Sequence, residues 1–236
     1  MSIRLLASVR DSDEARAAAA AGADFIDLKE PRQGALGGLP PEAIRQVVGN
    51  LRRHHPQAPV SATIGDHSAH DWPAIGDAVA AVGACGVDYV KVGVGWGDAA
   101  ARHALLGRLA DLPWPVVPVF IADEGLDWSA VDLACRLPFP ALMVDTQDKL
   151  AGSLFDCLSM AALGHFVGRA RGAGKLSGLA GALRANHLDA LAELAPDFAG
   201  FRGALCDGSR TGQLEGGRVH SLRQALAAPR QAGAPA

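Results

Sequence analysis

The chain has 236 residues, of which 49% are hydrophobic and 20% are charged, so the composition is that of a globular protein and excludes disordered and fibrous classes. The formal net charge of −3 lacks the basic excess that is usual in nucleic-acid-binding proteins. The N-terminal apolar run is too brief for a signal sequence, and no apolar stretch is long enough to span a membrane. We therefore expect a cytoplasmic protein with neither nucleic-acid nor membrane partners.

Short apolar runs alternate with alanine-rich, helix-favouring segments along the whole chain. The runs predicted as strands are Ile3–Val9, Asp24–Lys29, Val60–Ile64, Val87–Val94, Pro115–Ala122, Ala141–Asp145, Leu176–Ala180 and Phe198–Gly203. The segments predicted as helices are Asp11–Ala21, Pro41–Leu51, Trp72–Ala84, Asp98–Ala110, Ser129–Arg136, Leu154–Ala173, His187–Leu194 and Ser221–Ala227. Asp11 and Ser12 are expected to cap the first helix, whereas Pro118 weakens the assignment of the fifth strand.

Eight strand–helix pairs with short connections predict a parallel sheet with helical crossovers. The first strand leads into Arg10-Asp11-Ser12 and not into the glycine-rich turn of an open dinucleotide-binding sheet. Closure is therefore favoured, and we predict the α/β class with a single (β/α)8 TIM barrel over residues 1–228. The small residues and prolines of 229–236 predict a flexible C-terminal tail.

Lysine is rare in this chain but recurs at strand ends. Of the 22 basic residues only four are lysine, and three of these follow or lie in predicted strands: Lys29, Lys91 and Lys149. Asp27 shares a strand face with Lys29, and Asp145 ends the sixth strand. Active sites of such barrels lie at the C-terminal strand ends, where converging ammonium groups are expected to lower the pKa of at least one lysine. A neutral lysine can form a Schiff base with a carbonyl, and aspartates can move protons.

The last two strands run into glycine, which predicts a phosphate site. Gly181 and Gly203 permit close backbone approach, and Arg202 or Arg210 supplies positive charge. The glycine-rich segment Cys206–Gly217 is expected to close over a ligand.

Other polar side chains are expected to have smaller roles or none in the chemistry. Ser61 and Thr63, on the third strand, complete the predicted substrate contacts. His67 and His70 follow that strand but are interpreted as surface residues. The four cysteines lie far apart and form no metal-ligand pattern, so we expect reduced thiols, no metal and no cofactor.

Six blocks, in order along the chain, resemble one family. They are FIDLKEPRQGALG (25–37), VSATIGD (60–66), YVKVG (89–93), MVDTQDK (143–149), SGLAGAL (177–183) and FRGALC (201–206). The chain resembles the (5-formylfuran-3-yl)methyl phosphate synthases, also called 4-(hydroxymethyl)-2-furancarboxaldehyde-phosphate synthases, of methanofuran biosynthesis.

The resemblance implies a lyase that condenses two glyceraldehyde 3-phosphate molecules into a phosphorylated furan aldehyde, with loss of phosphate and water. It implies that Lys29 is the Schiff-base lysine and Lys91 the proton acceptor. Asp27, Asp145 and Lys149 match the remaining acid–base positions. The shorter segment around Gly95–Gly97 and the segment Cys206–Gly212 depart from the family pattern, which affects the placement of the phosphate ligands.

Other functions stay open. A class I aldolase or a phosphosugar isomerase on the same barrel needs the same lysine and phosphate site, and a non-catalytic phosphate-binding barrel needs only the latter. The partner expected in each case is a small phosphorylated aldehyde or sugar. The apolar, alanine-rich helices favour a homo-oligomer. The alanine- and arginine-rich composition suggests one-carbon metabolism in a bacterial methylotroph.

Overall fold

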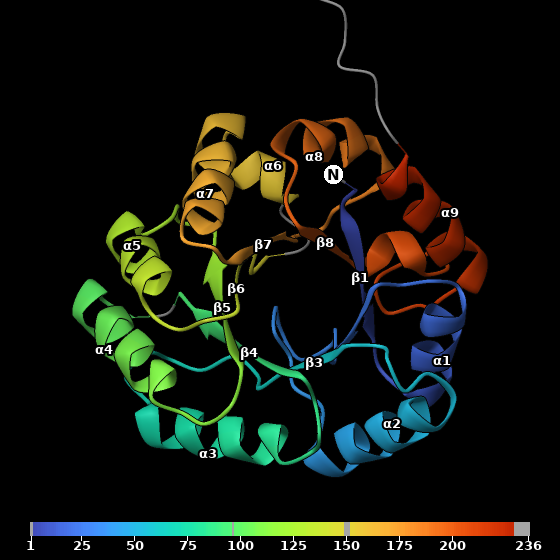
Figure 1. The fold of residues 1–236 in the computed structure, drawn as a ribbon, viewed down its shortest axis with the longest axis horizontal. Helices are drawn as coiled ribbons and strands as arrows, with labels where there is room; N and C mark the ends of the chain where they lie inside the picture. Colours follow the sequence, from blue (N-terminus) through green and yellow to red (C-terminus); the bar gives the residue numbers. More distant parts are fainter. Residues whose placement is uncertain (1, 96, 149–151, 229–236) are drawn as a thin grey trace, which may run out of the picture.

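Eight parallel strands form a closed barrel in which each strand pairs with its neighbours in sequence and β1 pairs with β8 (Figure 1). The computed structural model describes residues 2–95, 97–148 and 152–228. The strands are β1 (Arg4–Val9), β2 (Phe25–Leu28), β3 (Val60–Thr63), β4 (Tyr89–Val94), β5 (Val116–Ile121), β6 (Ala141–Asp145), β7 (Leu176–Leu179) and β8 (Phe198–Phe201). The predicted single (β/α)8 TIM barrel is thereby confirmed.

Helices surround this barrel as an outer ring (Figure 1). They are α1 (Ser12–Ala20), α2 (Pro41–His54), α3 (Trp72–Gly83), α4 (Ala99–Ala110), α5 (Trp128–Arg136), α6 (Leu154–Cys157), α7 (Met160–Gly172), α8 (Leu188–Leu194) and α9 (Gly216–Ala227). Two short 3-10 helices, η1 (Ala185–His187) and η2 (Gly203–Leu205), precede α8 and follow β8. Asp11 caps α1 as predicted, because its side chain accepts hydrogen bonds from two backbone N–H groups of the first turn.

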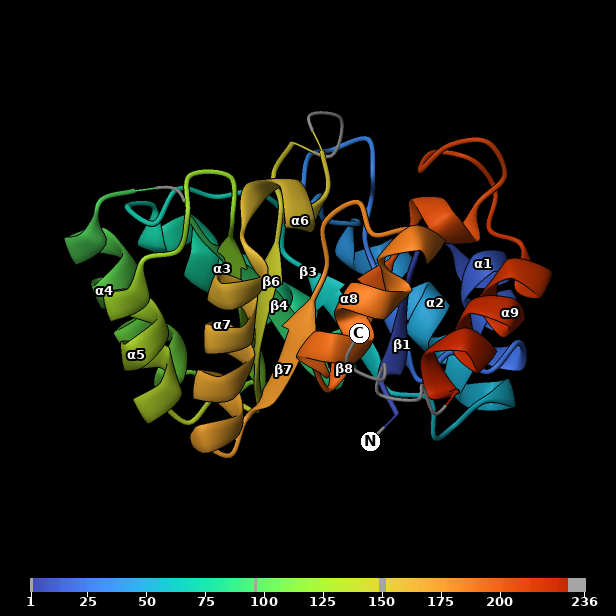
Figure 2. The same cartoon turned by 90° about the horizontal axis from the view of Figure 1, so that it is seen from above.

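One predicted helix is wrong. The segment Leu154–Ala173 forms α6 and α7, separated at Leu158, which has an extended backbone. Ser159 then caps α7 by accepting a hydrogen bond from the backbone N–H of Ala162. The interruption lets α6 lie beside the mouth of the barrel while α7 packs along its wall (Figure 2).

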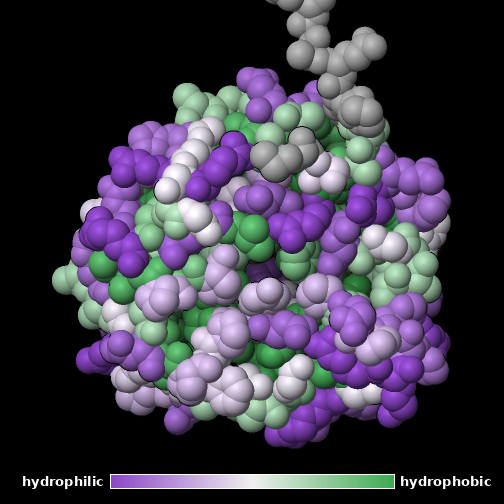
Figure 3. Space-filling view, in the orientation of Figure 1, coloured by the Kyte–Doolittle hydropathy of each residue, from purple (hydrophilic) through white to green (hydrophobic). Residues whose placement is uncertain are grey.

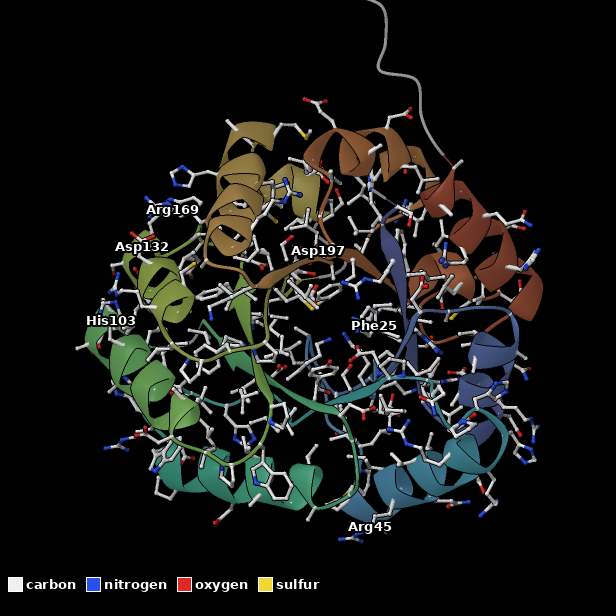
Figure 4. All side chains as sticks on the ribbon, in the orientation of Figure 1. Phe25, Arg45, His103, Asp132, Arg169 and Asp197 are labelled. Carbon is white, nitrogen blue, oxygen red and sulfur yellow. The ribbon has the colours of Figure 1, made fainter. Side chains whose placement is uncertain are left out.

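Two hydrophobic cores result from the alternation of side chains along each strand. The larger lies between the strands and the helices, and the smaller fills the barrel interior. The interior residues include Leu6, Val117, Val119, Met143 and Phe198. In Figure 4 Phe25 points into this interior, whereas Arg45 and His103 lie on the outer helices. The residues that fill the barrel interior are therefore apolar, so polar chemistry is expected at the C-terminal end of the barrel.

The loops that follow β2 and β8 rise at the same end of the barrel, opposite the N-terminus (Figure 2). On the face drawn in Figure 3, hydrophilic and hydrophobic residues are interspersed. Within the described residues, no helix has both the length and the apolar character needed to cross a membrane. The predicted tail, 229–236, lies outside the described residues.

Candidate active site

Four charged side chains gather at the C-terminal strand ends, although charged residues are rarely buried in proteins. Asp27 lies in β2, Lys29 directly follows it, Lys91 lies in β4 and Asp145 ends β6. None is more than 5% exposed. The sequence prediction that these residues share one end of the barrel is confirmed.

Asp27 and Lys91 form the deeper of two ion pairs. The Lys91 Nζ atom donates to both carboxylate oxygens of Asp27, at 3.0 Å each. Ser8 and Ser61 donate their hydroxyl groups to the same carboxylate, at 3.1 and 2.7 Å. Register explains the arrangement, because Asp27 pairs with Ser8 on β1 and with Ser61 on β3. The carboxylate is thus held by four charge-assisted hydrogen bonds in an apolar barrel.

Lys29 and Asp145 form the second pair, with 3.9 Å between Lys29 Nζ and Asp145 Oδ2. The other carboxylate oxygen of Asp145 accepts a hydrogen bond from the backbone N–H of Thr146 at 2.8 Å. From the sequence, repulsion between the ammonium groups was expected to dominate. The structure instead places a carboxylate beside each of these two lysines. Lys149, the third predicted lysine, lies outside the described residues.

Both pairs face a cavity of about 420 Å³, a size that suits a small phosphorylated molecule. Asp27, Lys29, Lys91 and Asp145 all line it. The rest of the wall comes largely from the ends of β7 and β8 and the loops after them: Ala180–Arg184, Gly200–Ala204 and Gly208–Arg210.

The two predicted glycines lie in this wall. Gly181 has a φ of +116°, and a Cβ atom there would lie 2.8 Å from Thr146 Cγ2, so only glycine fits. Ala182 follows with a positive φ of 46°, an uncommon conformation for a residue with a side chain. Gly203 begins η2. Consecutive residues with unusual backbone angles, such as Gly181 and Ala182, can turn their backbone N–H groups toward an anion.

The predicted substrate contacts on β3 differ from expectation. Ser61 binds Asp27 and does not line the main cavity; it lines a small apolar space deeper in the barrel. Thr63 is fully buried, and its hydroxyl donates to the carbonyl of Gly37 at 2.9 Å. Both side chains are therefore placed to fix neighbouring groups. Ser8, which the sequence analysis did not select, lines the cavity beside Asp27.

Arg202, which was expected to supply positive charge to a bound phosphate, is instead bound within the protein. All five of its N–H groups donate within the protein, to the carboxylate of Glu14 and to the carbonyls of Ser8, Arg210 and Gly212. The guanidinium therefore has no N–H group left for a ligand in this arrangement.

Arg210, the other candidate cation, is placed better. It lines the cavity, and burial lowers its guanidinium pKa despite the opposing effect of Asp145. Its Nη2 atom donates to the carbonyl of Gly34 at 3.3 Å, which joins the loops after β8 and β2. Within the described part of the chain, no cluster of three or more His, Cys, Asp or Glu side chains could hold a metal ion.

Comparison with known proteins identifies the family. Residues 5–223 match the family described as 4-HFC-P synthase. A Methylorubrum extorquens protein, provisionally named as a (5-formylfuran-3-yl)methyl phosphate synthase, is 39% identical over 95% of this chain and 92% of its own length. The (5-formylfuran-3-yl)methyl phosphate synthases of Methanopyrus kandleri and Methanosarcina barkeri are 35% and 31% identical, over 95% and 93% of this chain and 99% and 97% of theirs.

Solved structures share the fold. Phosphoribosyl anthranilate isomerase from Thermus thermophilus superposes with a TM-score of 0.63 at 15% identity, over 95% of this chain and 98% of its own. A 3-hexulose-6-phosphate synthase gives a TM-score of 0.56, also at 15% identity, over 96% of this chain and 100% of its own. At this identity the likeness supports the barrel and no particular activity.

Proposed function

The chain belongs to the 4-HFC-P synthase family, and we propose that it condenses two molecules of glyceraldehyde 3-phosphate into (5-formylfuran-3-yl)methyl phosphate, with loss of phosphate and water. The observation that carries this proposal is the pair of buried lysine–aspartate contacts facing one cavity. The resemblance of the six sequence blocks to the family and the names of the relatives support the same reaction.

Lys29 is the proposed Schiff-base lysine. It lies nearer the mouth than Lys91, since it follows the end of β2, whereas Lys91 lies within β4 and also lines the small apolar space deeper in the barrel. In its neutral form its Nζ atom attacks the aldehyde carbon of one substrate, and water leaves as the imine forms. Asp145, 3.9 Å away, is placed to exchange protons with the nitrogen during that step and to stabilise the iminium cation.

Lys91 is the proposed proton acceptor. The iminium makes the α-proton of the bound substrate acidic, and Lys91 removes it, once its own proton has left to solvent, to leave an enamine. The ammonium formed on Lys91 is then stabilised by Asp27, through the bidentate contact that the structure contains. Ser8 and Ser61 keep the Asp27 carboxylate in place during the transfer. Asp27 thereby acts on the lysine and not directly on the substrate.

The enamine carbon then attacks the aldehyde of the second substrate to form the new carbon–carbon bond. Asp145 and Lys149 are proposed to assist the dehydration, the elimination of phosphate, the closure of the ring and the final hydrolysis by water that releases Lys29 from the imine. Gly181, Gly203 and Arg210 are the proposed phosphate contacts, because they line the same wall of the cavity. On this proposal the enzyme is a carbon–oxygen lyase of methanofuran biosynthesis that acts in the cytoplasm, as a homo-oligomer.

Product formation tests the proposal. Purified protein is incubated with glyceraldehyde 3-phosphate, while ultraviolet absorbance follows the furan aldehyde and a phosphate assay follows the released anion. We expect both signals to rise together in the wild type and to be lost in Lys29→Arg. Lys175→Arg is the matched control, because Lys175 lies at the opposite end of the barrel and donates to the carbonyl of Phe139 at 3.0 Å.

The alternatives give different results in the same assay. A class I aldolase yields a hexose bisphosphate without released phosphate, and a phosphosugar isomerase yields an isomer of its substrate. A non-catalytic barrel binds phosphate without turnover. Any of these outcomes contradicts the proposed reaction.

A further inference from the structure

A buried ion pair outside the reacting groups joins the first helix to the last strand. Glu14, in the first turn of α1, is 3% exposed, and Arg202, directly after β8, is 8% exposed. The two guanidinium Nη atoms of Arg202 each contact one carboxylate oxygen of Glu14. This two-point geometry fixes both partners in orientation as well as in distance. We call these residues the Glu14–Arg202 clamp.

The clamp holds the segment Asp207–Leu214, here called the strand-eight loop. Arg202 Nε donates to the carbonyl of Arg210 at 2.9 Å, and its Nη2 donates to the carbonyl of Gly212 at 2.8 Å. The carboxylate of Glu14 accepts a hydrogen bond from the backbone N–H of Leu214 at 3.3 Å. Backbone groups along the loop are therefore bound by one buried ion pair.

Arg10 extends the clamp toward solvent. Its Nη2 atom contacts Glu14 Oε1 at 2.8 Å, and its Nη1 atom donates to the carbonyl of Thr211 at 2.9 Å. Glu14 is itself fixed, because Asp11 caps the first turn of α1 and accepts a hydrogen bond from the backbone N–H of Glu14. The loop is thus attached to a rigid helix end and not merely to its own strand.

The loop so held carries the arginine that faces the cavity. Gly208, Ser209 and Arg210 line the cavity that also contains Lys29 and Asp145. The carbonyl of Arg210 is bound directly by Arg202, so the backbone from which the Arg210 side chain projects has a defined position. Movement of the loop would carry the Arg210 guanidinium away from the cavity.

We propose that Glu14 and Arg202 are positioning residues that hold the strand-eight loop over the cavity, so that Arg210 binds a substrate phosphate. They act through Arg210 and do not themselves contact the substrate. The phosphate part of this inference rests on the proposed function, whereas the attachment of the loop does not.

Steady-state kinetics separate positioning from simple stabilisation. Arg202→Lys and Glu14→Gln are expected to raise KM for glyceraldehyde 3-phosphate about 10-fold, with kcat within about threefold, because binding is lost while the lysine chemistry is kept. The matched control is Arg52→Lys. Arg52 likewise joins a carboxylate, that of Asp88, to loop carbonyls, those of Pro56 and Ala58, but at the opposite end of the barrel.

The control variant is expected to lower Tm without changing KM. Equal KM values in wild type and Arg202→Lys overturn the proposal. The proposal also requires that substitutions of Arg202 and Arg210 affect KM through the same interaction. Arg210→Met raises KM, and adding Arg202→Lys to it produces no further increase if Arg202 acts through Arg210. Fully additive effects of the two substitutions overturn the proposal.

Limited proteolysis and binding of inorganic phosphate test the clamp even if the proposed reaction fails. Trypsin cuts after Arg210, whose carbonyl Arg202 binds. We expect faster cleavage there in Arg202→Lys than in wild type or Arg52→Lys, and weaker calorimetric binding of inorganic phosphate. Absence of furan product from wild-type protein refutes the proposed function alone. Unchanged cleavage and unchanged phosphate affinity in Arg202→Lys refute the clamp alone.

Discussion

Replacing Asp27 with asparagine is predicted to destabilise the fold as well as to abolish activity. The substitution keeps the side-chain volume but removes the charge opposite Lys91, which is 2% exposed. Removing one partner of a buried ion pair costs about 3–5 kcal/mol, because the remaining charge has lost its compensation. For a domain of this size each kcal/mol lowers Tm by about 2–4 °C, so we expect a fall in Tm of roughly 6–20 °C.

Thermal unfolding at neutral pH, followed by circular dichroism, measures this effect. The double variant Asp27→Asn, Lys91→Met removes both charges and is expected to regain at least half of the lost Tm. Asp197→Asn is the matched control: Asp197 accepts hydrogen bonds from the backbone and hydroxyl of Ser177, at 2.8 Å each, near the other end of the barrel. An Asp27→Asn variant as stable as this control, or a double variant less stable than either single one, refutes the reasoning.

Two further substitutions test the clamp and the barrel interior. Burial raises the pKa of Glu14, but hydrogen bonds from Arg202 and Arg10 outweigh it, so the folded-state pKa lies below 4.5. The stabilisation from the charged Glu14 carboxylate is therefore fully present above about pH 4.5 and is lost as the pH falls through the lower folded-state pKa. Glu14→Gln should therefore make the fall in Tm at acid pH less steep, and a fall as steep as that of the wild type contradicts this. In Gly178→Ala the new Cβ would lie 2.2 Å from ring atoms of Phe198, and such overpacking costs about 1–3 kcal/mol. Urea unfolding should show that loss, smaller when Phe198→Leu is also present; an equal loss in both backgrounds argues against the clash.

The barrel could be predicted because its determinants are local. Alternation of short apolar runs with helix-favouring segments recurs eight times, and each signal lies within one element. The break between α6 and α7, at Leu158 and Ser159, was missed because helix-favouring residues lie on both sides of it. Ser159 was the available signal, since serine commonly precedes a helix.

The candidate catalytic cluster could be predicted in part for the same reason. Strand ends are local features, and lysine and aspartate at those positions are unusual enough to select Asp27, Lys29, Lys91 and Asp145. Which lysine pairs with which aspartate depends on the register between strands. The sequence therefore predicted repulsion between the lysines but not the carboxylate that lies beside each of them. Ser8 was missed because only pairing between β1 and β2 brings it to Asp27.

The role of Arg202 could not be predicted from the residues around it in the sequence. Glycines around it favoured a phosphate role, but its partner Glu14 lies 188 residues earlier in the chain. Nothing in the sequence near either residue indicates the other. Only closure of the barrel, which places β8 beside β1, brings them together.

Borohydride trapping tests the central chemical claim most directly. Protein is mixed with glyceraldehyde 3-phosphate and sodium borohydride, digested and analysed by mass spectrometry, with Lys29→Arg and Lys175→Arg treated in parallel. We predict a reduced triose phosphate adduct on the peptide containing Lys29, present in Lys175→Arg and absent in Lys29→Arg. An adduct on Lys91 instead, or none from protein that forms the furan product, contradicts the assignment.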